Sequence, residues 1–149
     1  MASPLVDTEV LLSRRILAVD DEEPNLLLLR SLLDREGYRH VHCLSDPEEA
    51  LSSFPALSPD LVLLDLMMPN IDGFQLLEAF RRHARPDEYL PILVLTADTT
   101  LQARRRALAL GASDFVSKPF DVIEVALRIS NLLETRILYE RLRLERLPD

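Results

Sequence analysis

Polar side chains that could carry chemistry stand at the ends of four short, mostly apolar segments of this 149-residue sequence. Each segment has the length of a buried strand, and its polar residue follows the last apolar positions. Three carboxylates, one hydroxyl group and one ammonium group therefore occupy the same kind of local position. They are Asp20 and Asp21 after residues 16–19, Asp65 after 61–64, Thr96 after 92–95, and Lys118 after 114–117.

The segments that must position these groups alternate between strand-like and helix-like patterns. Such alternation is typical of an α/β domain with a doubly wound parallel sheet. Asp46 and Glu49 predict a capping box at the start of the second helix. We expect strands at 16–19, 40–44, 61–65, 92–96 and 114–116. We expect helices from Pro24 to Gly37, from Asp46 to a stop before Pro55, from Gly73 to His83, from Leu101 to Gly111 and from Asp121 to Pro148.

The last expected helix is longer than such a domain needs, about 40 Å at 1.5 Å per residue. We therefore expect it to project from the domain beyond about Leu133. Leu133, Ile137, Leu144 and Leu147 fall near a heptad spacing, although Glu140 occupies one core position of that seam. This pattern favours a dimerising or signal-transmitting helix, with a merely solvated terminal helix as the alternative.

The composition of the chain limits its partners. The net charge of −8 opposes contact with a phosphate backbone, so direct nucleic-acid binding is not expected. Cys43 is the single cysteine, which excludes an intramolecular disulfide, and no apolar run approaches bilayer length, so we expect a cytoplasmic protein without membrane contact. The expected organisation is an N-terminal extension at 1–14, a domain at 15–133 and a helical linker at 134–149.

In a parallel α/β sheet, ligands bind outside the carboxyl ends of the strands, where all five polar residues are expected. Three carboxylates close together repel one another, and the usual remedies are a raised pKa of one of them or a bound divalent cation. Oxygen ligands with open positions favour Mg²⁺. Such a cation would let ionised Asp65 attack a phosphoryl group while Lys118 neutralises charge on the other side, and no general base is required.

Four sequence motifs together resemble the receiver domain of bacterial two-component response regulators. The resemblance covers roughly residues 14–133 and implies a flavodoxin-like (β/α)5 fold. The motifs are Asp20-Asp21-Glu22, Asp65-Leu66-Met67-Met68-Pro69 with Asp72-Gly73, Thr96-Ala97, and Lys118-Pro119-Phe120.

The resemblance assigns a role to each matching residue. It implies that Asp65 is the phosphoacceptor and that Asp20, Asp21, Asp65 and the backbone carbonyl of Met67 hold Mg²⁺. Lys118 would bind the phosphoryl group, and the bond before Pro119 would be cis. Thr96 would move toward the phosphoryl group beside the small Ala97, and Phe115 would follow it as a switch that acts by packing alone.

The same resemblance implies a signalling switch rather than an enzyme. A sensor histidine kinase or a phosphotransfer protein would donate the phosphoryl group. The face formed by residues 101–110, 114–116 and the helix after Asp121 would then change, and this face, the C-terminal helix or both would form a homodimer. The helix would regulate a partner or an output domain. Residues 131–136 and the arginine-rich helix after them are similar to linkers that precede HD-GYP-type cyclic di-GMP enzymes.

Two other functions fit part of the pattern. Haloacid-dehalogenase-like phosphatases also use a strand-end aspartate, Mg²⁺ and a lysine, but they need an acid two residues after the nucleophile. Met67 stands at that position. A receiver-like module that dimerises constitutively is the other alternative, and the complete set of five polar residues argues against it.

Overall fold

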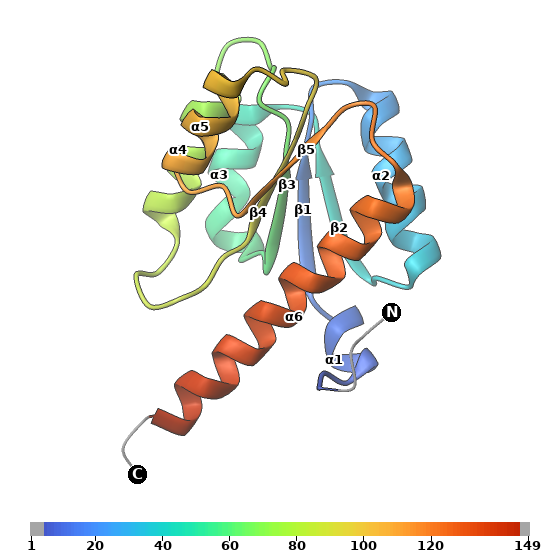
Figure 1. Ribbon diagram of the computed structural model, residues 1–149, viewed down its shortest axis with the longest axis vertical. Helices are drawn as coiled ribbons and strands as arrows, with labels where there is room; N and C mark the ends of the chain where they lie inside the picture. Colours follow the sequence, from blue (N-terminus) through green and yellow to red (C-terminus); the bar gives the residue numbers. More distant parts are fainter. Residues whose placement is uncertain (1–4, 147–149) are drawn as a thin grey trace.

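The computed structural model describes residues 5–146 and has a single five-stranded parallel sheet in the order β2-β1-β3-β4-β5 (Figure 1). The strands are β1 (Arg15–Val19), β2 (His40–Leu44), β3 (Leu61–Leu64), β4 (Ile92–Thr96) and β5 (Asp114–Ser117). The helices are α1 (Thr8–Leu12), α2 (Glu23–Glu36), α3 (Pro47–Leu57), α4 (Gly73–His83), α5 (Leu101–Ala109) and α6 (Val122–Arg146). The expected doubly wound, flavodoxin-like architecture is confirmed.

Helices cover both faces of the sheet, which explains why the strands are almost continuously apolar. On β1, Ile16 and Ala18 pack with α1, α2 and α6, whereas Leu17 and Val19 pack with α3, α4 and α5. Successive strand residues point to opposite faces, so one short strand contributes to both cores. The sheet is therefore held from both sides, and its strand ends are rigid supports for polar groups.

Two helix signals differ from the sequence-based expectations. Asp46 caps α3 by accepting a hydrogen bond from the Glu48 amide, but the reciprocal capping box lies at α4, between Asp72 and Gln75. Helix α3 also continues through Pro55 to Leu57, so the expected stop before Pro55 is wrong. Pro55 lies in the last turn, so the distortion that a proline causes affects only the two helical residues that follow it, and the Ser58 amide closes the helix by donating to the Phe54 carbonyl.

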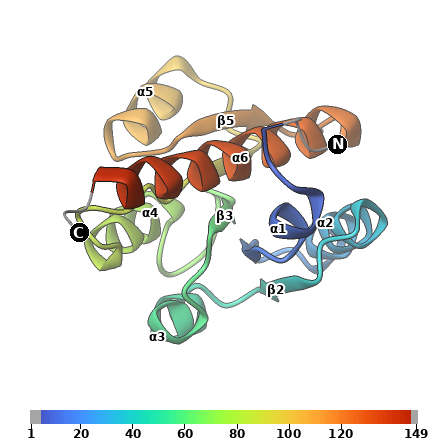
Figure 2. The same cartoon turned by 90° about the horizontal axis from the view of Figure 1, so that it is seen from below.

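The N-terminal segment contains a helix that the sequence patterns did not predict. Helix α1 is short, and its flanking Val6 and internal Leu11 are buried in the core that also contains residues of α6. Asp7 caps this helix by accepting from the Glu9 amide. Residues 5–14 thus cover the lower end of the sheet beside α6 (Figure 2).

The last helix stays packed on the domain further than expected. Leu133 is fully buried and Ile137 is 2% exposed, both within the core on the α2 side of the sheet. The expectation that the helix projects from about Leu133 is therefore wrong, because α1 supplies an apolar surface that the sequence patterns did not reveal. Only the end of α6 extends beyond the domain, and residues 141–145 are exposed (Figure 1). Leu147 lies outside the described residues.

None of the helices between residues 5 and 146 combines the length and the apolarity that crossing a membrane requires.

Candidate functional site

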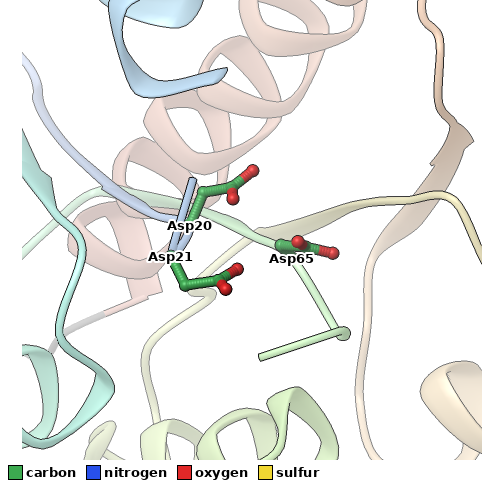
Figure 3. A group of neighbouring side chains, drawn as sticks. All are labelled: Asp20, Asp21 and Asp65. Atoms are coloured by element: carbon green, nitrogen blue, oxygen red, sulfur yellow. The ribbon is translucent and has the colours of Figure 1, made fainter. Parts of the chain in front are cut away.

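Three aspartates meet at the carboxyl edge of the sheet. Asp20 and Asp21 follow β1, Asp65 follows β3, and these two strands are paired neighbours, with Val19 opposite Leu64. One carboxylate oxygen from each aspartate lies within 4.8 Å of the others, and Figure 3 shows the three side chains grouped together. Asp20 is 2% exposed and Asp65 is 6% exposed. Because β1 and β3 are adjacent in space but not in sequence, the crossover between them creates the cluster.

Lys118 brings a positive charge to this cluster from the loop after β5. Its Nζ donates hydrogen bonds to Asp20 Oδ2 at 2.6 Å and to Asp65 Oδ2 at 3.3 Å. The Lys118 amide donates to the Thr96 carbonyl, and the bond between Lys118 and Pro119 is cis. Burial alone would lower the pKa of Lys118, but the hydrogen bond to Asp20 and the charge of Asp65 outweigh it and raise the pKa. Lys118 therefore carries its charge at neutral pH.

Asp65 is held in a partly desolvated environment. Burial raises the pKa of Asp65, and the charge of Asp20 acts in the same direction. The hydrogen bond that Asp65 Oδ1 accepts from the Met67 amide and the nearby Lys118 ammonium oppose this shift, but the pKa stays above its ordinary value. The ionised carboxylate is thus less stable here than in water, and a further cation would lower its energy.

Asp21 supplies an independent test of whether the cluster fits a metal ion. Its Oδ1 atom is buried and has no hydrogen-bond partner among the residues that the structure describes. A buried polar atom without a partner is rare, and an ion is one of its accepted explanations. The donor set consists of carboxylate oxygens, which are the ligands that Mg²⁺ prefers. The residues present therefore fit a divalent cation.

The other residues expected at the site lie around this group. Thr96 is buried at the end of β4, and its hydroxyl accepts a hydrogen bond from the Asp98 amide rather than contacting the carboxylates. Phe115 is buried in the core on the α5 side, with the Arg104 guanidinium 5.8 Å from its ring centre. Ala97 is exposed at the rim. The structure thus brings Asp20, Asp21, Asp65 and Lys118 together. Thr96 and Phe115 are buried nearby, and in the described part of the chain no hydrogen bond joins either side chain to the carboxylates.

A surface hollow of about 510 Å³ is lined by Asp65 and Lys118 and gives access to the Asp65 carboxylate. The Met67 side chain at its rim is 57% exposed. The hollow is lined by Glu22, Asn25, Leu28, Asp65, Met67, Ala97, Lys118, Pro119 and Phe120. Sequence reasoning gave no role to four of the lining residues, Glu22, Asn25, Leu28 and Phe120.

Gly73 also contributes to the site, by allowing two backbone segments to approach. A Cβ atom at Gly73 would lie 2.3 Å from Leu66 Cα and 2.5 Å from the Asp65 carbonyl oxygen. The Gly73 amide donates to the Leu66 carbonyl at 3.0 Å. The first turn of α4 therefore supports the backbone that carries Asp65. The only sequence signal for this role is the Asp72-Gly73 pair, which follows Asp65 within the motif that resembles receiver domains.

A parallel sheet of this strand order, with three acids and a lysine at its carboxyl edge, defines the CheY-like class of α/β domains. The chain belongs to the response regulator receiver domain family, whose model matches residues 16–130. It is 38% identical over 127 residues to the transcriptional regulatory protein TrcR of Mycobacterium tuberculosis, covering 85% of this chain and 48% of TrcR. It is 39% identical over 122 residues to the alkaline phosphatase synthesis transcriptional regulatory protein PhoP of Bacillus subtilis, covering 82% of this chain and 49% of PhoP.

Solved structures agree with this assignment. The chemotaxis protein CheY4 of Vibrio cholerae superposes with a TM-score of 0.74 at 28% identity, covering 80% of this chain and 98% of CheY4. Receiver domains are signalling domains rather than conventional enzymes, and they generally bind Mg²⁺ at an acidic pocket. Response regulators act with histidine kinases and often carry output domains. This chain spans about half the length of TrcR and PhoP.

Proposed function

We propose that the protein is a phosphorylation-controlled switch in which Asp65 accepts a phosphoryl group from a histidine kinase or a phosphotransfer protein. One observation carries the proposal. Oxygen atoms of Asp20, Asp21 and Asp65 lie within 4.8 Å of one another, and Lys118, which follows β5 at the same edge of the sheet, bonds to two of these acids. Such a group fits a divalent cation among the carboxylates and a phosphoryl group beside the Lys118 ammonium.

The transfer requires little more than positioning and charge compensation. A carboxylate oxygen of Asp65 attacks phosphorus, the bond from phosphorus to the donor's histidine nitrogen breaks, and an acyl phosphate results. Asp20, Asp21, Asp65 and the Met67 carbonyl would hold Mg²⁺, which would supply neutralising charge when bound. Lys118 turns from Asp20 toward the phosphoryl oxygens, and the Met67 amide keeps Asp65 Oδ1 oriented.

The switch would begin at Thr96. Its hydroxyl accepts a bond from the Asp98 amide, and it would exchange this contact for one in which it donates to the phosphoryl group. The exposed Ala97 leaves room for that movement, and Phe115 would repack beneath it. Because Arg104 lies over the Phe115 ring, the repacking would be transmitted to α5. The surface formed by α5, β5 and α6 is therefore the one expected to change.

This surface and the end of α6 are the proposed sites of self-association. Leu101 and Leu108 of α5 and Leu142 and Leu144 of α6 are exposed apolar side chains. A homodimer through the α5-β5-α6 surface, through the end of α6 or through both would cover them. The output is a partner or a further domain, and the transcriptional regulators among the relatives favour one that acts on transcription.

The phosphatase alternative has no comparable support. The position two residues beyond Asp65 holds the exposed, apolar Met67, which has no proton to give to a leaving group.

Phosphotransfer followed by mapping of the modified residue tests the proposal. The protein is incubated with Mg²⁺ and either acetyl phosphate or a phosphorylated kinase, and the labelled peptide is identified by mass spectrometry. Asp65→Asn should abolish the modification. Asp72→Asn is the matched control, because asparagine caps a helix as well as aspartate does. Label that persists in the Asp65→Asn variant would exclude Asp65 as the acceptor.

A further inference from the structure

The second half of α6 is fastened to the end of the sheet opposite the phosphoacceptor. The fastening centres on Arg136, which is 9% exposed. Its Nε donates to Asp60 Oδ1 at 2.9 Å, its Nη1 to the Tyr89 carbonyl at 2.8 Å, and its Nη2 to Glu88 Oε2 at 3.2 Å. Glu140, one turn further along α6, lies 3.3 Å from the same guanidinium. We call these five residues the α6 clamp.

The N-terminal segment secures the other flank of the helix. Arg14 Nη1 donates to Glu140 Oε2 at 2.9 Å and lies 3.6 Å from Asp60 Oδ1, so it joins the clamp directly. Arg141 donates to the Leu5 carbonyl at 2.7 Å. Seen from below, α1 and α4 lie on the same side of α6 at different points along it, and β5 and α5 lie on the other side (Figure 2). The helix is therefore held by the residues that precede β3 and β4 and by the N-terminal segment, for about one turn beyond Ile137.

The clamp and the phosphoacceptor site lie at opposite ends of the same strands. Asp60 immediately precedes β3, and Asp65 immediately follows it. Glu88 and Tyr89 precede β4, and Thr96 is its last residue. Two short, fully buried strands thus connect the residues that hold α6 to the residues that would meet the phosphoryl group.

The geometry of the α6 clamp suits a role in fixing the orientation of α6 better than a role in stabilising the folded state. An arginine fork that meets three acceptors at fixed angles tolerates neither a rotation of α6 nor a shift along its axis. Buried ion pairs contribute little net stability because desolvation offsets their attraction, but breaking one leaves an uncompensated charge. A soluble linker does not need such a network, since water satisfies its side chains.

We infer that α6 is a rigid lever rather than a hinged linker, and that Arg136 is the positioning residue that sets its direction as it leaves the domain. The inference rests on the proposed function, because it concerns how the phosphorylation signal leaves the domain. A change in the α5-β5-α6 surface then reaches residues beyond Glu140 as a displacement of the whole helix. A partner or a domain attached there is reoriented, not released.

Distances between two spin labels test this inference in the full chain. Cysteines replace the exposed Ser31 on α2 and Glu145 on α6 in a Cys43→Ala background, and pulsed electron paramagnetic resonance gives the distance distribution. We expect one narrow peak without phosphorylation. Arg136→Ala should lose the narrow peak. Arg128→Ala is the matched control, because it removes an arginine from the same helix outside the clamp and should keep the peak.

Two further variants guard against simple unfolding. Arg136→Lys keeps the charge but not the fork, and Glu88→Gln removes one acceptor, and each should broaden the distribution while circular dichroism shows a folded protein. A broad peak in the unmodified protein, or a narrow peak in folded Arg136→Ala, overturns the inference. With Mg²⁺ and beryllofluoride as a phosphoryl mimic, the peak should shift and stay narrow, and broadening would instead indicate a released linker.

The two hypotheses fail separately in this design. The measurement without a phosphoryl mimic tests the clamp without involving Asp65. If mass mapping finds no modification at Asp65 while the narrow peak depends on Arg136, the lever stands and the proposed function falls.

Discussion

Gly73→Ala adds one methyl group at the first residue of α4, beside the backbone that carries Asp65. The new Cβ would lie 2.3 Å from Leu66 Cα and 2.5 Å from the Asp65 carbonyl oxygen. Carbon atoms in contact normally sit about 3.5–4.0 Å apart, so the two segments must separate by more than about 1 Å. Both opposing atoms belong to the backbone, and no side-chain rotation can relieve the clash.

Because backbone atoms cannot move aside easily, the Gly73→Ala substitution should lower the free energy of unfolding. Overpacking a tight site typically costs about 1–3 kcal/mol, and a clash with backbone belongs at the upper end of this range. For a protein of this size, 1 kcal/mol corresponds to a change in Tm of roughly 2–4 °C, so Gly73→Ala should lower Tm by roughly 6–12 °C. A displacement of Asp65 by about 1 Å should also slow its phosphorylation by about 100-fold.

Thermal unfolding and the rate of phosphorylation by acetyl phosphate measure the two effects. Gly37→Ala is the matched control, because Gly37 has φ +95° and its added Cβ would meet only the flexible Leu12 side chain, at 3.2 Å. That variant should lose stability through backbone strain and keep the phosphorylation rate of the wild type. If Gly73→Ala has the Tm and the phosphorylation rate of the wild type, then α4 does not support Asp65 in the way described.

Three more outcomes are expected. The pKa of Asp65 is higher in the folded state than in the unfolded chain, so between these two pKa values the folded protein holds a proton that the unfolded chain releases. The free energy of unfolding therefore falls as pH rises from the unfolded pKa to the folded pKa. Asp65→Asn should therefore be more stable than the wild type at pH 7 without Mg²⁺, with the difference shrinking as pH falls toward about 4, and urea unfolding at several pH values measures it. Asp21→Asn should weaken Mg²⁺ binding by more than about 10-fold in calorimetric titration, and equal affinities would remove Asp21 from the ligand set. Asn70 has φ +69°, so Asn70→Ala should cost about 1 kcal/mol in chemical denaturation while Asn70→Gly costs none, and equal losses would show that backbone strain is not the cause.

Local patterns were sufficient for the parts of the molecule that depend on nearby residues. Each of the five strands was located within one residue at either end, because an apolar run bounded by polar residues reports burial directly. The end of α2 at Gly37 followed from the need for a left-handed residue there. The helix stop expected before Pro55 is wrong because the cost of a proline depends on how many helical turns follow it, which a local pattern does not show.

The sequence by itself determined which residues face the carboxyl edge of the sheet, since residue type and position at a strand end are properties of a few neighbouring residues. The sequence therefore identifies Asp20, Asp21, Asp65, Thr96 and Lys118 as one group. Only the tertiary structure decided that Lys118 meets Asp20 across 98 residues of chain and that Arg136 meets Asp60 across 76. Such contacts arise when the fold closes and water is excluded, so no local spacing encodes them.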